Sequence, residues 1–351
     1  EVGHGGKVLG NIDFGRPVLP LKLRKRPHGD AKKLRRFRLG ELARLHLPAE
    51  PGKKGRLRMP KMGLGTDSVL FVHKLHTGNS KLAKRAWSFY YHRIMQPIWN
   101  RQHSNSISDA LRMGYRLIDT SAAYHNEEAI GRAVKKSGIP REELFIQTRC
   151  TNRQQYNHAV RDSFFASLKK LGLDYVDMYM IHWPVTDVFI DTWHEMEKLY
   201  KEGYVRNLGV ANCHQHHLED IIKNCEIRPV INQVEIHPLF TQKPLIAYCQ
   251  SQGIQMEAYS PIAQNNDRLR NNRLLKSLAT KYGKSMQQII LRWHVQNGVI
   301  PIPRSSNKDR LKENKDIFEF TLTDDEMKKI DAININSRLR YDPDNCDFTE
   351  L

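Results

Sequence analysis

Short apolar runs alternate with longer stretches of helical periodicity from residue 59 almost to the end of the chain. Most of the runs are apolar through their middles, which is typical of strands buried beneath helices on a parallel sheet. Helical stretches between consecutive strands are the pattern of repeated βαβ units. The predicted strands occupy residues 59–66, 115–122, 144–150, 175–183, 205–212, 230–237, 254–261 and 298–304.

Eight strands with helices between them favour an α/β fold closed as a (β/α)₈ TIM barrel over an open sheet. Such a barrel takes about 250 residues. The chain has 351 residues, 40% of them hydrophobic, so it is long enough for one barrel and an extension. Active sites of these barrels lie at the carboxyl ends of the strands. The residues to examine there are Asp119, Arg149, His182, Asn212, Gln233, Tyr259 and Arg304.

The first 56 residues follow a different pattern, in which proline and glycine interrupt every possible helix and no period of 2 or 3.6 is sustained. We therefore expect residues 1–56 to form a poorly ordered N-terminal extension and residues 57–351 to form the barrel. Residues 1–104 hold 23 Lys and Arg against 6 Asp and Glu, whereas residues 105–351 hold 33 against 32. Of the formal net charge of +18, residues 1–104 thus carry +17 and residues 105–351 carry +1.

Charge, cysteine content and hydropathy narrow the class of protein. No run of about 18 uncharged apolar residues occurs, and the first residues lack the apolar block of a signal peptide. The five cysteines show no CxxC or metal-ligand spacing, so we expect reduced thiols and no metal. These features indicate a cytoplasmic monomer, with the basic third as a possible contact to an anionic membrane or glycolipid surface. For this basic third of the chain, nucleic acid is a less favoured partner than a membrane or glycolipid surface.

Four of the residues at or near the predicted strand ends suit the reduction of a carbonyl group, which needs an acid to protonate oxygen and donors to stabilise the developing alkoxide. Tyr124 is the natural acid. Because a free tyrosine has a pKa near 10, it needs a nearby cation, and Arg149 can supply one. Asp119 can anchor Arg149, and His182 can donate a hydrogen bond to the substrate oxygen. Singly, each residue could be an ordinary cap, core or ion-pair residue, but their joint placement favours a site.

Several ordered motifs of the chain resemble the aldo-keto reductases. They are GYRLIDTSAAYHNEEAIGRAV, LDYVDMYMIHWP, GVANC, INQVEIHP, EAYSPIA and IPIPRSSNKDRLKEN, and the similarity extends from about residue 57 to residue 335. The resemblance implies a barrel enzyme that reduces an aldehyde or ketone with NADPH. It places the catalytic roles on Asp119, Tyr124 and His182, with the position of the family's catalytic lysine at 149.

The same resemblance implies a site for NADPH at the carboxyl ends of the strands. Asn212 and Gln233 would hold the nicotinamide carboxamide, and Tyr259 would stack on the ring. The cofactor-binding set that the resemblance implies is Thr66, Asp119, Asn212, Gln233, Tyr259, Ser260, Arg304, Ser305, Arg310 and Asn314. The choice of NADP over NAD also has a physical basis, because guanidinium and hydroxyl donors at a helix start suit a 2′-phosphate. No GxGxxG follows the early strands, so a Rossmann domain is not indicated.

Two departures from the family pattern change the expectation. Arg149 stands where the family has lysine, and its planar fork is longer and differently directed than an ammonium group. A barrel that binds the cofactor with weak or lost catalysis, acting as a sensor or as a membrane- or partner-associated scaffold, is therefore the alternative function. The second departure is an insertion at about residues 68–104, in which residues 81–101 have the spacing of a basic amphipathic helix. Such a helix could pack on the rim of the barrel, cover the site as a lid or contact a membrane.

The end of the chain is less informative. TLTDDEMKKIDAIN predicts a helix with Thr323 as its N-cap and acidic residues in its first turn. The residues after 336 correspond to the family's variable C-terminal loop, which shapes the choice of substrate.

Overall fold

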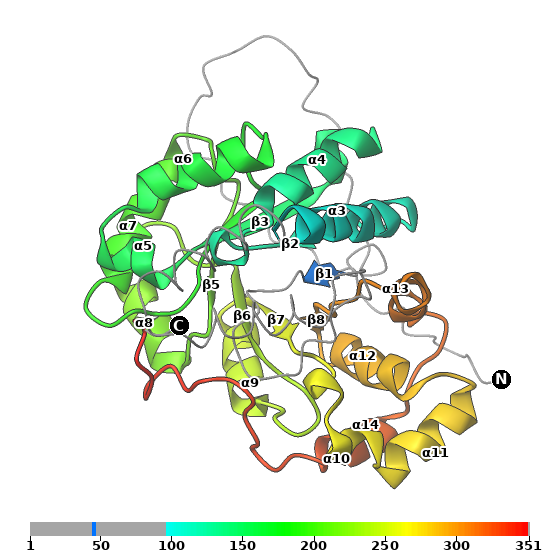
Figure 1. Ribbon diagram of the computed structural model, residues 1–351. Helices are drawn as coiled ribbons and strands as arrows, with labels where there is room; N and C mark the ends of the chain where they lie inside the picture. Colours follow the sequence, from blue (N-terminus) through cyan, green and yellow to red (C-terminus); the bar gives the residue numbers. More distant parts are fainter. Residues whose placement is uncertain (1–43, 47–95, 350–351) are drawn as a thin grey trace, which may run out of the picture.

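A parallel sheet surrounded by helices forms the molecule (Figure 1). The computed structural model describes residues 44–46 and 96–349, with side chains from residue 104 onward. The strands are β1 Arg44–His46, β2 Leu117–Asp119, β3 Phe145–Cys150, β4 Met178–Ile181, β5 Leu208–Ala211, β6 Ile231–Glu235, β7 Gln255–Tyr259 and β8 Val299–Pro301. Each strand pairs in parallel with the next, so the order in the sheet is the order in the chain. The predicted (β/α)₈ architecture is confirmed.

Helices connect the strands and lie around the sheet. The α-helices are α3 Gln96–Arg112, α4 Glu127–Ser137, α5 Asn152–Tyr156, α6 Val160–Leu171, α7 Phe189–Lys201, α8 Gln215–Asn224, α9 Lys243–Ser251, α10 Asp267–Arg270, α11 Arg273–Tyr282, α12 Met286–Gln296, α13 Lys308–Lys315 and α14 Asp324–Asp331. Single 3₁₀ turns occur at η3 Ala122–Tyr124, η4 Arg141–Glu143 and η5 Ala263–Asn265. In the part of the chain that the structure describes, no helix combines the length and the apolar character that crossing a membrane requires.

The first strand is not where the sequence predicts it. Strands β2 to β8 all fall inside the predicted runs, but β1 is Arg44–His46, which pairs with β2 through Leu45 and Ile118. Three residues in an extended conformation are enough for this pairing. A segment of this length is too short to show a period of hydrophobic and polar positions. The predicted first strand at 59–66 lies outside the described residues. The division of the chain at residue 57 stays a prediction.

The predicted insertion is described only in part. Its last residues, 96–104, belong to α3, the helix that leads into β2 and packs on α4 and α13. Residues 81–95, the larger part of the predicted amphipathic helix, lie outside the described residues. The predicted rim, lid and membrane roles of that helix are therefore untested.

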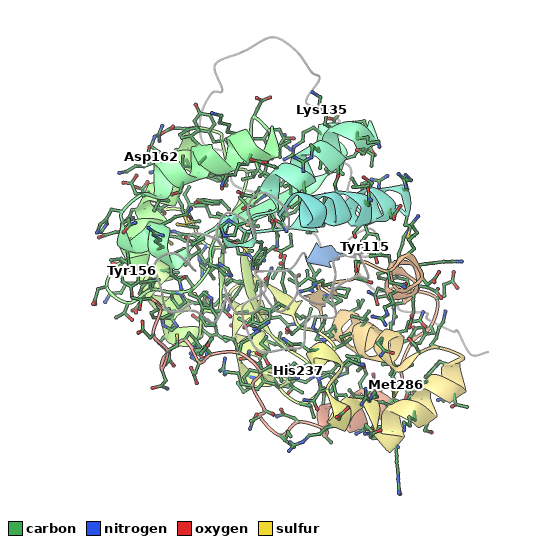
Figure 2. The ribbon with its side chains drawn as sticks, viewed as in Figure 1. Tyr115, Lys135, Tyr156, Asp162, His237 and Met286 are labelled. Carbon is green, nitrogen blue, oxygen red and sulfur yellow. The ribbon has the colours of Figure 1, made fainter. Side chains whose placement is uncertain are left out.

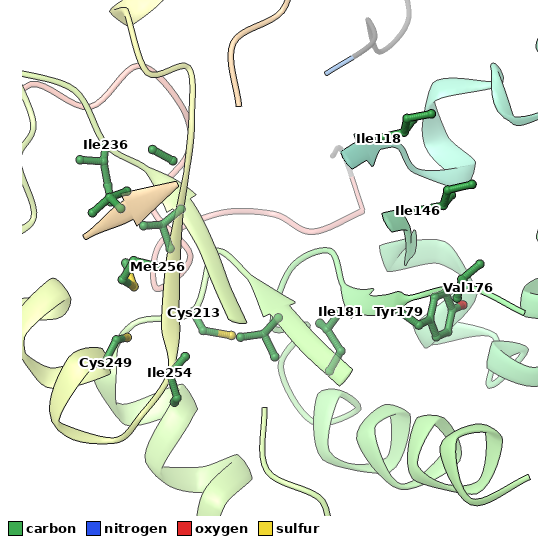
Figure 3. Close-up of a cluster of buried hydrophobic side chains, with 14 of the residues drawn as sticks. Ile118, Ile146, Val176, Tyr179, Ile181, Cys213, Ile236, Cys249, Ile254 and Met256 are labelled. Carbon is green, nitrogen blue, oxygen red and sulfur yellow. The ribbon is translucent and has the colours of Figure 1, made fainter. Parts of the chain in front are cut away.

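Alternate residues of the strands face the helices and make the main core. Because side chains alternate across a strand, every second position of β2, β3, β4 and β7 is covered by helices. Those shown in Figure 3 include Ile118, Ile146, Tyr179, Ile181 and Met256. Charged residues such as Lys135 of α4 and Asp162 of α6 lie on the outer surface (Figure 2). The sequence pattern predicts buried strands beneath amphipathic helices, and the structure has these two layers.

The other face of the sheet lines the barrel interior, which changes from apolar to polar along the strands. Apolar side chains fill the amino-terminal half, and they are Leu117, Phe145, Met178, Met180, Ile231 and Ile300. Two residues further along the same strands, the inward positions are Asp119, Gln147 and Gln233, which are fully buried. The barrel is therefore closed by packing at one end and offers polar groups at the other.

Two close contacts set the helices around β2 in place. Tyr115 Oη, buried before β2, donates a hydrogen bond to the carbonyl oxygen of Leu311 in α13 at 2.7 Å. On the opposite side of α3, α4 approaches α6 so closely that a Cβ on Gly131 would lie 2.3 Å from the carbonyl oxygen of Leu171. The predicted helix after Thr323 is confirmed as α14, whose N-cap accepts from the backbone N–H of Glu326.

Candidate active site

An ion pair is buried where β2 and β3 end. Asp119 is the last residue of β2 and Arg149 lies near the end of β3, and their side chains are 0% and 2% exposed. Arg149 Nη2 is paired with Asp119 Oδ1, and Arg149 Nη1 donates a hydrogen bond to Tyr124 Oη at 3.1 Å. The structure therefore brings together three of the four predicted catalytic residues in one chain of contacts.

Tyr124 and His182 meet at the same place. Tyr124 ends the η3 turn, which Ser121 caps by accepting from the backbone N–H of Ala123 at 3.2 Å. His182 follows β4 directly, and its ring meets the ring of Tyr124 edge to face, with centroids 5.9 Å apart. Ser121 Oγ lies 3.4 Å from His182 Nδ1. The segments that follow β2 and β4 thus hold a phenol and an imidazole beside each other.

Burial and charge act in opposite directions on the proton of Tyr124. Burial raises the pKa of Tyr124 to about 12, while the positive charges of Arg149 and Arg340 lower this pKa and the charge of Asp119 raises it. Burial lowers the pKa of Arg149, but Asp119 and Tyr124 raise it, and the net direction is upward. At neutral pH the phenol is therefore protonated and its neighbour is a cation.

A layer of amides and carboxylates supports Asp119 from inside the barrel. Gln233 Nε2 donates to Asp119 Oδ1 at 3.1 Å and to Glu257 Oε2 at 2.9 Å. Gln147 Nε2 also donates to Asp119 Oδ1, and to Glu257 Oε2 at 3.2 Å. The sequence analysis missed Gln147 and Glu257. The available signal was a polar residue two positions before a predicted site residue in a buried strand, as in Gln147 before Arg149 and Glu257 before Tyr259.

The residues predicted to contact the nicotinamide lie at the ends of β5, β6 and β7. Asn212 follows β5 in a left-handed conformation with φ 61°. Its Nδ2 donates to the carbonyl oxygen of His182 at 2.9 Å, and its Oδ1 accepts from Tyr259 Oη at 2.8 Å. Ser260, next to Tyr259, is also left-handed, with φ 48°. The chain therefore reverses sharply at both strand ends, which directs these side chains across the mouth of the barrel.

The residues predicted to contact the 2′-phosphate and the adenine cluster at α13. Arg304 and Arg310 are exposed, whereas Ser305 and Asn314 are buried. Ser305 Oγ accepts from the backbone N–H of Asn307, the N-cap of α13, at 3.1 Å. Two exposed cations thus flank a hydrogen-bonded helix start. Thr66, the remaining predicted cofactor residue, lies outside the described residues.

This donor set fits a phosphorylated nicotinamide dinucleotide at both ends. Gln233 Oε1 is a fully buried acceptor, and no donor within the described residues reaches it, so a carboxamide N–H could use it. At the other end, exposed guanidinium groups at a helix amino terminus match the charge and geometry of a phosphate.

The C-terminal segment, residues 336–349, borders the site on the side of β6. Glu235, the buried last residue of β6, accepts hydrogen bonds from the backbone N–H of Leu339 at 2.6 Å and of Arg340 at 2.8 Å. Further along, Phe348 packs beside Trp183, and its carbonyl oxygen accepts from Asn152 Nδ2 at 3.1 Å. The segment that the resemblance assigns to substrate choice is thus fastened at two points to the carboxyl ends of the barrel.

Sequence comparison relates the whole described barrel to known oxidoreductases. Residues 87–335 match the model of the aldo/keto reductase family. The glyoxal reductase of Bacillus subtilis is 48% identical over 245 residues, which cover 70% of this chain and 88% of that protein. The methylglyoxal reductase of Escherichia coli is 42% identical over 247 residues, covering 70% of this chain and 89% of the relative.

Solved structures agree with the sequence comparison. An aldo-keto reductase from a deep-sea metagenome superposes with a TM-score of 0.68 at 40% identity, over 69% of this chain and 90% of that one. The aldo-keto reductase of Bombyx mori in complex with NADP superposes with a TM-score of 0.64 at 38% identity, over 70% and 86% of the two chains. With its parallel barrel and its match over most of its length, the chain belongs to the aldo/keto reductase family of oxidoreductases.

Proposed function

We propose that the protein reduces a small aldehyde or ketone to an alcohol, with NADPH as the hydride donor and Tyr124 as the general acid. The observation that carries the proposal is the contact chain from Asp119 through Arg149 to the hydroxyl of Tyr124. A buried acid next to a fixed cation is the arrangement that proton transfer to a developing alkoxide requires.

Each residue of this contact chain, and His182 beside it, has a part in the reaction. NADPH, when bound, supplies the hydride that the carbonyl carbon receives. Tyr124 gives its proton to the carbonyl oxygen, and Arg149 stabilises the phenolate that remains. His182, beside the ring of Tyr124, orients the same oxygen by donating a hydrogen bond. Asp119 neutralises Arg149 and holds it in place, so that the cation is directed at the phenol and not at the substrate.

Reactive small carbonyl compounds are the first substrates to test. Two relatives that are more than 40% identical over this barrel are named glyoxal reductase and methylglyoxal reductase. A small dicarbonyl compound needs few contacts beyond those with the catalytic side chains. It therefore suits a substrate site in which the identified polar groups are the catalytic ones.

The alternative is a cofactor-binding barrel that has lost efficient catalysis through the arginine at position 149. The geometry favours the enzyme, because Arg149 keeps both contacts that a catalytic cation needs, one to Asp119 and one to Tyr124. The deciding experiment follows the loss of NADPH absorbance with glyoxal, methylglyoxal and a panel of simple aldehydes and ketones. Turnover with any of them supports the proposal. Tight NADPH binding with no turnover in the wild type, and turnover in Arg149→Lys, would establish the alternative.

Cofactor choice is expected to depend on the two exposed arginines at α13. Arg304→Gln and Arg310→Gln should each raise the KM for NADPH by about 10- to 100-fold, because each removes a charge-assisted hydrogen bond worth about 1.5–3 kcal/mol. The KM for NADH should change little. Arg132→Gln, which removes an exposed arginine from the outer surface of α4, is the matched control. Equal losses for NADPH and NADH would show that these arginines do not contact the 2′-phosphate.

A further inference from the structure

Three histidines and an aspartate that the proposed reaction does not use gather at the start of α8. His214 is the N-cap of this helix, and His216 and His217 lie in its first turn. Asp344 reaches them from the C-terminal segment, 130 residues further along the chain. We call these four residues the His/Asp cluster. One nitrogen or oxygen atom from each member lies within 4.8 Å of the others.

The carboxylate of Asp344 is at the centre of the cluster. Its Oδ2 lies 2.7 Å from His214 Nδ1, and its Oδ1 lies 3.2 Å from His216 Nε2 and 3.6 Å from His217 Nε2. In a tetrahedral site with metal–ligand bonds of about 2.0 Å, neighbouring ligand atoms are about 3.3 Å apart. The distances from Asp344 are close to this value, and the four ligand atoms must draw together from a spread of up to 4.8 Å to enclose an ion.

The kind of ligand selects the kind of cation. Three imidazoles and one carboxylate suit Zn²⁺ and its near neighbours Co²⁺ and Ni²⁺, whereas Mg²⁺ and Ca²⁺ prefer oxygen ligands. Two aspartates supply negative charge, because Asp342 Oδ1 also lies 3.9 Å from His214 Nε2. We propose that the His/Asp cluster is a zinc site, with His214, His216 and Asp344 as ligands and His217 as the fourth.

Two contacts of the cluster must change when the ion binds. His217 Nδ1 accepts from the backbone N–H of His214 at 3.2 Å, so coordination through His217 Nε2 requires this bond to be given up. Arg338 Nη2 lies 3.2 Å from His214 Nε2, and a metal on Nδ1 leaves Nε2 protonated. Arg338 can then turn to Asp342, whose Oδ2 is already 3.8 Å from the same Nη2.

Zinc at this position joins two parts of the site. His214 is two residues from Asn212 at the end of β5, and Asp344 lies in the segment that Glu235 fastens at Leu339. The ion therefore reinforces the contact that His214 and Asp344 already make between the barrel and the C-terminal segment. Because the ion binds only the folded arrangement, it also stabilises the folded protein.

Calorimetric titration of the full-length protein with ZnCl₂ tests the proposal. Since the chain has 16 histidines, the readout is the difference between variants and not the total number of ions bound. His216→Gln and Asp344→Asn should each weaken one class of zinc site by more than tenfold, as expected for loss of a ligand. His194→Gln, which removes an exposed histidine from α7, should bind like the wild type.

Cobalt provides the second measurement. Co²⁺ bound by the wild type should give the intense visible absorption of a four-coordinate ion, and this band should be absent from His216→Gln and Asp344→Asn. His216 is more than half exposed, so its replacement leaves the fold intact. Equal zinc affinity in the wild type and both variants, or a cobalt spectrum that the substitutions leave unchanged, would overturn the proposal.

Discussion

Tyr124→Phe is expected to lower kcat for carbonyl reduction by about 10²- to 10⁴-fold, the usual contribution of a general acid. The substitution removes one oxygen atom and keeps the ring that packs against His182. NADPH affinity, followed by fluorescence, should therefore remain within about twofold, because the phenol does not belong to the cofactor-binding set. If the variant retains more than a tenth of the wild-type kcat, a group other than Tyr124 donates the proton.

The same experiment has a pH component. Since burial raises the pKa of Tyr124 to about 12, the acid stays protonated throughout the neutral and mildly alkaline range. A raised pKa preserves the acid form up to that value, so kcat/KM should show no loss from Tyr124 ionisation between about pH 6 and 9. A falling limb in this range in the wild type that disappears in Tyr124→Phe would contradict the assignment.

Arg149→Met is expected to affect both stability and activity. It leaves the carboxylate of Asp119 buried without its cation, and breaking a buried pair in this way costs about 3–5 kcal/mol. It also removes the charge that stabilises the phenolate of Tyr124, so kcat should fall by at least about 10²-fold. Urea unfolding measures the first effect, and steady-state kinetics measure the second.

Two companion variants separate the causes. Arg149→Lys keeps the charge and should lose little stability, since the site does not use every donor of the guanidinium. Within the described residues, the buried Arg149 Nε–H has no acceptor. The double variant Asp119→Asn/Arg149→Met removes both charges and should be more stable than Arg149→Met alone. If the single and double variants unfold at the same urea concentration, the unpaired carboxylate of Asp119 is not the cause of the lost stability.

The sequence predicts most of the sheet because strands β2 to β8 carry strong local signals. Most are short apolar runs with a polar or aromatic residue at the carboxyl end, and parallel strands bring those ends together whatever the lengths of the helices between them. That rule is enough to place Asp119, Arg149 and His182 on one face of the barrel. The three-residue strand β1 lacks such a signal, and pairing with β2 decides its position.

Other features depend on contacts between distant parts of the chain and cannot be predicted from local pattern. Gln147 and Glu257 appear in the sequence as interruptions of apolar strands, and the hydrogen bonds that Gln147 and Gln233 both donate to Glu257 are visible only across the barrel. The meeting of His214 with Asp344 likewise depends on the path of a C-terminal segment without regular structure. For Tyr124 the sequence predicts the acid but not its raised pKa, since burial is a property of the fold.

The way in which Glu235 holds the C-terminal segment bears on how this enzyme could be redesigned. Both hydrogen bonds use main-chain N–H groups, those of Leu339 and Arg340, so the anchor is indifferent to the side chains at these two positions. Proline alone is excluded, because it has no N–H to donate. Because the Leu339 side chain packs against the hydrophobic core, a combinatorial library at the exposed position 340 would vary the chemistry beside the carboxyl end of β6 while the segment keeps its path.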